Sequence, residues 1–143
     1  MNKRVLILFV FLMGMAYAQA QGPVRDRIKT LKVAFITERV GLTSQEAQQF
    51  WPIYNEHEDA LENIRRKEVQ SRLSAAQGLS DSESATLLDN LLALQTEKYD
   101  ADQAFISKIR KVISPKKVLL LLKAEDDFKK RLLQQYRRRQ EGG

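Results

Sequence analysis

The chain has 143 residues, a net charge of +6 and no cysteine. The lack of cysteine excludes disulfides, thiol nucleophiles and thiolate metal sites. With a single histidine, His57, and no glycine-rich phosphate loop, the sequence offers no nucleophile–base pair, so we expect neither an enzyme nor a cofactor.

Residues 1–20 have the pattern of a secretory signal peptide. A basic start precedes the apolar run 5–15, and two overlapping Ala-x-Ala sites end at Ala18 and Ala20. The apolar run is shorter than the ~20 residues that cross a bilayer, which argues against a membrane anchor. We predict a periplasmic, soluble mature protein that forms a single helical domain over residues 21–143.

Hydroxyl residues that follow an apolar residue predict three helix starts. Their side-chain oxygens can accept hydrogen bonds from the unpaired amides of the first turn. At the first two starts a glutamate three residues later can complete a capping box, and at the third a proline takes the first helical position. The cap residues are Thr43 with Glu46, Ser80 with Glu83, and Ser114.

These starts divide the mature chain into four helices, at about 24–39, 44–76, 81–113 and from 115 to the polar tail. Apolar residues recur every three or four positions and no stretch alternates for long, so strands are not expected. The two middle helices exceed thirty residues, or ~50 Å each. This favours an all-α fold built on an elongated antiparallel helical hairpin with shorter flanking helices. Because such narrow apolar stripes bury little surface, we also expect a homodimer.

The segment 50–54 is the densest aromatic cluster. A helix buries one stripe, so these side chains either pack on the first helix or are partly offered to a partner. Pro52 removes one backbone hydrogen bond and should kink the helix. We expect Phe50 to be buried and Trp51 to be more available, and Trp51, Pro52 and Tyr54 are the candidate client-binding residues.

Two other polar groups could carry chemistry. No residue one helical turn from His57 could share a metal ion, which predicts a histidine at the edge of the core and not a ligand. The acidic run 125–127 is typical of a solvated helix face, so no metal site is expected. The basic runs 129–131 and 137–139 suit acidic clients, lipid headgroups or simply a solvated helix end. Nucleic acid is not an expected partner of an exported protein.

The helix starts at Leu42-Thr43 and Leu79-Ser80 resemble the Leu-Thr-x-x-Gln motif of the Spy/CpxP family of periplasmic proteins, with Glu46 and Glu83 where the family has Gln. The chain also looks like a Bacteroidetes-type group in that neighbourhood, often labelled sensors of an extracytoplasmic-function sigma factor or refolding chaperones. That likeness rests on four segments: 34–38, 42–54, 115–119 and 124–128.

The resemblance implies a curved helical dimer that holds unfolded clients without ATP. We therefore expect a periplasmic ATP-independent chaperone or an envelope-stress accessory protein whose partners are unfolded or envelope proteins. The alternative is a non-catalytic regulator that docks on a membrane sensor or an anti-sigma factor. A related branch senses metals through His and Cys residues, and one histidine without cysteine argues against that role here.

Overall fold

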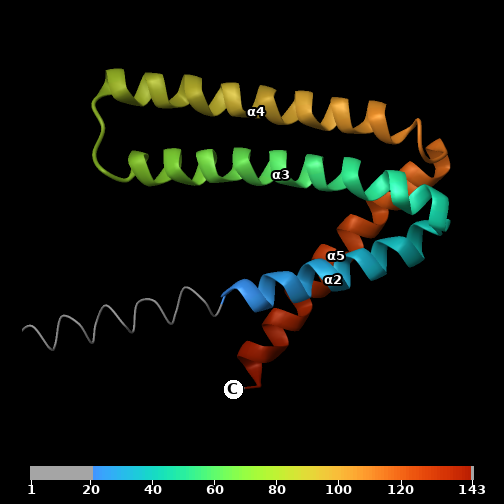
Figure 1. Ribbon diagram of the computed structural model, residues 1–143. Helices are drawn as coiled ribbons and strands as arrows, with labels where there is room; N and C mark the ends of the chain where they lie inside the picture. The colour runs from blue at the N-terminus through green and yellow to red at the C-terminus, as the bar shows by residue number, and fades with distance from the viewer. Residues whose placement is uncertain (1–20, 143) are drawn as a thin grey trace, which may run out of the picture. The chain divides into compact units, whose positions relative to one another are not determined.

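The computed structural model describes residues 21–142, so the predicted signal peptide over residues 1–20 lies outside the described part of the chain. Across residues 21–142 the structure contains helices and no strand (Figure 1). The helices are α2 (Gln21–Val40), α3 (Ser44–Ala75), α4 (Asp81–Ile109) and α5 (Pro115–Glu141). The all-α class, and the two longer middle helices with shorter neighbours, are confirmed.

The predicted capping boxes form at both long helices. The Thr43 amide donates to Glu46 Oε2 at 2.9 Å, and the Glu46 amide donates to Thr43 Oγ1 at 3.2 Å. Ser80 and Glu83 make the same reciprocal pair ahead of α4. These bonds satisfy first-turn amides that have no partner inside the helix, and therefore fix where each helix begins.

The turn before each box has a glycine in the left-handed region. Gly41 has φ +66° and Gly78 has φ +77°, a backbone conformation that side chains with a Cβ rarely adopt. The third cap is simpler: the amide of Lys117 donates to Ser114 Oγ at 3.3 Å, and Pro115 occupies the first helical position. All three predicted starts are thus confirmed to the residue.

Helix α4 ends at Ile109, four residues before the predicted end at Ile113. After Ile109 the hydrogen-bond pattern is mixed: the amides of Lys111 and Val112 bond to carbonyls three residues back, and that of Ile113 bonds to the Ile109 carbonyl four residues back. Pro115 disfavours the helical conformation of the residue before it, so the chain must leave the helix in time to present Ser114 as a cap. Ile113 lies beyond the helix end but is a core residue, 3% exposed, so its apolar side chain continues the apolar pattern of the helix in the sequence.

The described residues form two compact units. The hairpin unit spans residues 41–120, and the terminal unit combines 21–40 with 121–142. Helix α5 runs from one unit into the other. A single domain over residues 21–143 stays a prediction. No helix within residues 21–142 has the length and apolar character needed to cross a membrane.

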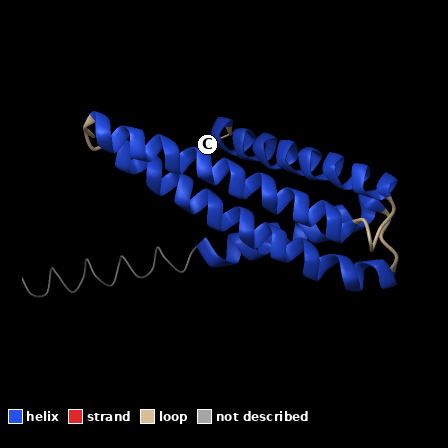
Figure 2. Cartoon of the chain, turned by 90° about the horizontal axis from the view of Figure 1, so that it is seen from above, coloured by secondary structure: helices blue, strands red, loops and turns tan. Residues whose placement is uncertain are grey.

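In the hairpin unit, α3 and α4 run antiparallel, side by side (Figures 1 and 2). The facing side of α3 buries Phe50, Tyr54 and Ile64, and that of α4 buries Leu94, Phe105 and Ile109. The apolar pattern of α4 favours Leu88, Leu92 and Tyr99 for this seam, but these three side chains are exposed. Helix α3 continues through Pro52 without interruption. Long cations tie the two helices together at two places along the hairpin: Lys67 bonds Glu97 at 2.9 Å, and Lys108 bonds Glu56 at 2.7 Å. The buried side chains of this unit are Phe50, Tyr54, Ile64, Leu94, Phe105, Ile109, Ile113 and Val118.

In the terminal unit, α2 packs on the later part of α5. The rings of Phe35 and Phe128 lie 5.6 Å apart, and the guanidinium groups of Arg39 and Arg131 lie over the Phe35 ring at 5.2 and 5.1 Å. Each cation can gain about 0.5–1 kcal/mol over an aromatic face at an exposed site. The other buried side chains are Ile36, Val40, Leu121 and Ala124.

Candidate binding face

The aromatic cluster on α3 is mostly core. Phe50 has no exposed surface, Tyr54 is 2% exposed, and their rings stack at 5.5 Å. Tyr54 also meets the Phe105 ring of α4 edge-on at 6.1 Å. The cluster therefore anchors the start of α3 against α4, and the ring geometry suits the offset and edge-on contacts that aromatic pairs prefer.

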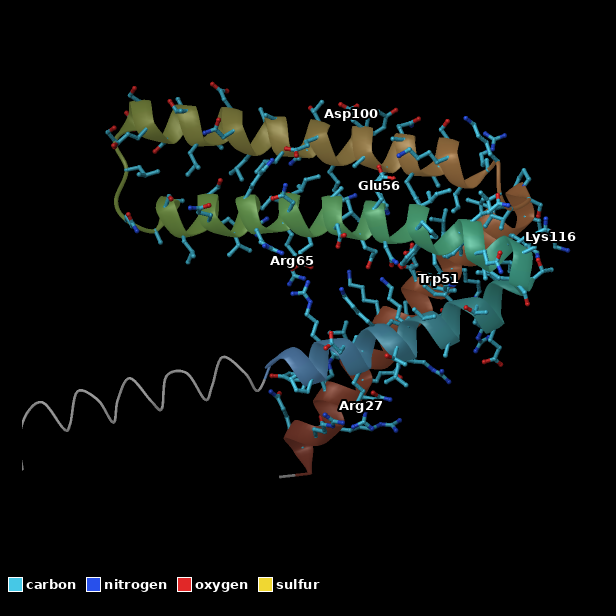
Figure 3. All side chains as sticks on the ribbon, viewed as in Figure 1. Arg27, Trp51, Glu56, Arg65, Asp100 and Lys116 are labelled. Atoms are coloured by element: carbon cyan, nitrogen blue, oxygen red, sulfur yellow. The ribbon has the colours of Figure 1, made fainter. Side chains whose placement is uncertain are left out.

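The predicted client-binding residues separate in the structure. Trp51, labelled in Figure 3, is half-buried and packs edge-on against Phe50 at 4.9 Å. Pro52 is exposed and Tyr54 is buried. Tyr54 follows Phe50 by four residues and precedes His57 by three, so it lies on the buried stripe and offers little surface to a client. The client-binding role of these residues stays a prediction. The expected contrast between a buried Phe50 and a more available Trp51 is confirmed.

The capping box of α3 is extended by a lysine from α5. Lys117 Nζ donates to the Gly41 carbonyl at 2.7 Å and to Glu46 Oε2 at 2.6 Å. The bond from Lys117, and then the bond from the Thr43 amide, hold the pKa of Glu46 below its usual value. The cap residues Thr43 and Glu46 thus have a structural role. Together with Lys117 they join two helix starts that lie more than seventy residues apart in the sequence.

A polar group interrupts the seam between α3 and α4. His57 Nε2 lies 2.8 Å from Asp102 Oδ1, and the imidazole stacks on the Phe105 ring at 4.1 Å. Lys98 Nζ donates to the other carboxylate oxygen at 2.7 Å. Burial raises the pKa of Asp102, but the bonds from Lys98 and His57 outweigh it and the pKa is lowered.

This polar group has little room for a substrate. The His57 side chain is 10% exposed, and its Nδ1 is buried without a hydrogen-bond partner among the described residues. The predicted position of His57 at the core edge is confirmed. Its partner Asp102 was not predicted, although both residues interrupt apolar stripes, and such matched interruptions on two antiparallel helices are the signal that could have paired them.

Metal binding has no support in the described residues. Across residues 21–142 no group of three or more His, Cys, Asp or Glu side chains could hold an ion. In the acidic run 125–127, Asp127 is used by the helix itself, since Lys123 Nζ donates to its Oδ2 at 2.9 Å.

The hairpin unit carries a set of large apolar side chains that are open to solvent. Five of them, between 49% and 64% exposed, occur at helical spacing on the two helices; we call this set the hairpin apolar face. It comprises Val69 and Leu73 of α3 with Leu88, Leu92 and Tyr99 of α4.

The register of the hairpin brings these side chains together. The pairs Lys67–Glu97 and Tyr54–Phe105 align the antiparallel helices so that Val69 is level with Leu92, and Leu73 with Leu88. At about 100° per residue, the four apolar side chains point roughly 120–180° away from Lys67 and Glu97 on their own helices.

The two sides of the hairpin therefore differ in chemistry. One side carries the interhelical ion pairs, including Glu56, which reaches from α3 to Lys108 of α4 (Figure 3). The other side carries the hairpin apolar face, with the Arg66–Glu62 pair of α3 beside it. Sequence periodicity does not reveal this face, because Leu88 and Leu92 fit the same heptad pattern as the seam. Only the buried positions of Leu94 and Phe105 show which stripe is covered.

Comparisons with known proteins returned no relative. No protein family matches the chain, and no curated protein or solved structure is significantly similar to it. The resemblance to the Spy/CpxP family therefore stays a prediction.

Proposed function

We propose that the chain is a non-catalytic, ATP-independent chaperone of the periplasm that binds apolar segments of unfolded proteins. The observation that carries this proposal is the hairpin apolar face. Monomeric proteins rarely expose contiguous apolar surface without using it for binding. The proposed ligand is an unfolded or partly folded envelope protein.

The chemistry of this face suits weak and adaptable contacts. Its α4 stripe consists of Ala85, Leu88, Leu92, Gln95, Tyr99 and Gln103, none of which is charged. The Gln103 side chain donates to the Tyr99 hydroxyl at 3.0 Å, which leaves that aromatic ring lying along the helix. An uncharged apolar strip gains energy from any apolar segment and imposes no sequence, which is what a general chaperone requires.

A double substitution on this face tests the proposal. Leu88→Ser with Leu92→Ser should reduce suppression of aggregation for several unrelated clients, because both exposed side chains contribute contact area and little folding energy. The matched control is Ala93→Ser with Ala104→Ser, which adds two hydroxyls to exposed positions of α4 on the ion-paired side. Light scattering would measure protection and circular dichroism would confirm folding. Equal protection by both variants would contradict the proposal.

A regulator that docks on a membrane sensor or an anti-sigma factor is the alternative. The same face favours it, because two parallel rows of apolar side chains fit a partner helix. The two functions differ in breadth. A chaperone protects unrelated clients, whereas a regulator would be captured by one envelope protein and would lose that capture in the Leu88→Ser, Leu92→Ser variant.

The predicted homodimer competes for the same surface. If a second copy covers the hairpin apolar face, the double substitution should convert a dimer into a monomer without loss of helicity. Light scattering coupled to size-exclusion chromatography would show this. A dimer that resists the double substitution would place the contact elsewhere and leave the face available for clients.

A further inference from the structure

The charge of the chain is divided unevenly between its two units. Residues 21–40 and 121–142 carry 12 basic and 6 acidic side chains, a net charge of +6. Residues 41–120 carry 10 basic and 12 acidic side chains, a net charge of −2. The positive balance of the described residues therefore resides wholly in the terminal unit.

The first half of α2 combines these cations with exposed apolar side chains. Val24 is 58% exposed and Leu31 is 51% exposed, and the half-buried Ile28 lies between them on the same stripe. At about 100° per residue, Arg27 and Lys32 flank this stripe on its two sides. Asp26, the only acidic residue between 21 and 37, lies on the opposite face.

The last turns of α5 repeat the pattern. Leu133 is 51% exposed and Tyr136 is 62% exposed, and the exposed cations of 129–131 and 137–139 surround them. Arg27 on α2 lies in the same unit as this segment (Figure 3). Both segments therefore present apolar side chains set among long cations, with no deep groove needed for binding.

We propose that the terminal unit docks on the surface of an anionic phospholipid bilayer through residues 24–32 of α2 and 129–139 of α5. Basic helices with an exposed apolar stripe lie in the bilayer interface, where the apolar side chains enter the acyl boundary and Lys and Arg reach back to the phosphates. Tyr136 suits this position, because a tyrosine has an apolar ring and a polar tip.

Charge and shape favour a bilayer over an acidic polypeptide. The apolar side chains are spaced along two helix surfaces and flanked by cations, which matches a broad surface of headgroups above hydrocarbon. The hairpin unit, at −2, gains nothing from such a surface. This inference goes beyond the proposed chaperone activity, since it would concentrate that activity at the membrane surface.

The test is binding of the chain, as recovered after export, to phosphatidylcholine vesicles with and without phosphatidylglycerol. Arg137→Gln, Arg138→Gln and Arg139→Gln together should weaken binding to the anionic vesicles about a hundredfold, the equivalent of roughly 3 kcal/mol. Val24→Ser with Leu31→Ser should weaken it about tenfold while keeping the charge. The matched control is Arg110→Gln, Lys111→Gln and Lys116→Gln, which removes three exposed cations from the hairpin unit and should change affinity by no more than about twofold.

Three results would overturn the inference. Equal binding to neutral and anionic vesicles would remove the role of charge, and equal losses in the two triple variants would remove the role of the terminal unit. Unchanged binding in the Val24→Ser, Leu31→Ser variant would reduce the interaction to that of a polycation. Suppression of aggregation in vesicle-free solution should be unchanged in all these variants, which separates this test from that of the proposed function.

Discussion

Phe50 should be the most costly single position in the hairpin unit. Its side chain has no exposed surface and contacts Trp51 and Tyr54 at ring distances of 4.9 and 5.5 Å. Removing a fully buried Phe ring costs about 3–5 kcal/mol, through the lost transfer free energy and the cavity left behind. Domains of this size unfold with about 5–15 kcal/mol, so Phe50→Ala should remove a large share of the stability.

Urea titration offers a direct measurement of this cost. Trp51 is the only tryptophan of the chain and packs edge-on against Phe50, so its emission reports the hairpin unit, while far-ultraviolet circular dichroism reports all the helices. The matched control is Leu88→Ala on the exposed side of α4, which should change stability by no more than about 0.5 kcal/mol. The reasoning would be refuted if Phe50→Ala cost less than about 1 kcal/mol, or no more than the control.

Three further predictions concern neighbouring groups. Trp51→Ala should destabilise less than Phe50→Ala, because Trp51 is half-buried, and thermal melts beside a light-scattering assay will show whether client protection falls with it. Lys117→Met should destabilise the start of α3, since it leaves Glu46 and the Gly41 carbonyl without their cation, and hydrogen exchange at residues 44–47 should rise. The pKa of Glu46 and of Asp102 is lowered on folding, so both contribute stability above their unfolded pKa that is lost as the pH falls through the folded value. Lowering the pH below about 4 should therefore reduce the stability of the wild-type chain more than it reduces the stability of the Asp102→Asn variant. A steeper acid-induced loss of stability in the variant would contradict the lowered pKa of Asp102.

The helix starts could be predicted from sequence because their signals are local. A hydroxyl residue, a glutamate three positions later and a preceding glycine act within one turn, and the structure forms these bonds at Thr43 and Ser80 as expected. The end of α4 was less predictable. Ile113 fits the helical period and is buried in the core. The helix ends earlier because Pro115 favours an extended backbone at Ser114.

The candidate site could not be predicted in the same way, because it depends on which of two stripes is covered. Leu91 and Leu92 are adjacent in sequence, yet Leu91 is partly buried and Leu92 is 60% exposed. Periodicity alone gives both residues similar weight. The difference arises from the hairpin register, which ion pairs such as Lys67–Glu97 and the stacking of His57 on Phe105 fix across thirty or more residues of chain.

That register also explains why polar residues occupy the seam. An apolar seam of leucines could slip and rotate at little cost, and a rotated pairing would bring part of the hairpin apolar face into the seam. The bond between His57 and Asp102 can form in only one register. In another register the imidazole, whose side chain is 10% exposed, would lose this partner, at a cost of about 1 kcal/mol. We therefore expect His57→Leu to retain helicity while it weakens client protection, because the helices could then shift and cover Leu88 and Leu92. Cysteine pairs introduced at Val69 with Leu92, which are level only in the native register, would measure the shift by their rate of crosslinking. Unchanged crosslinking in the His57→Leu background would show that apolar packing and the ion pairs suffice to hold the hairpin.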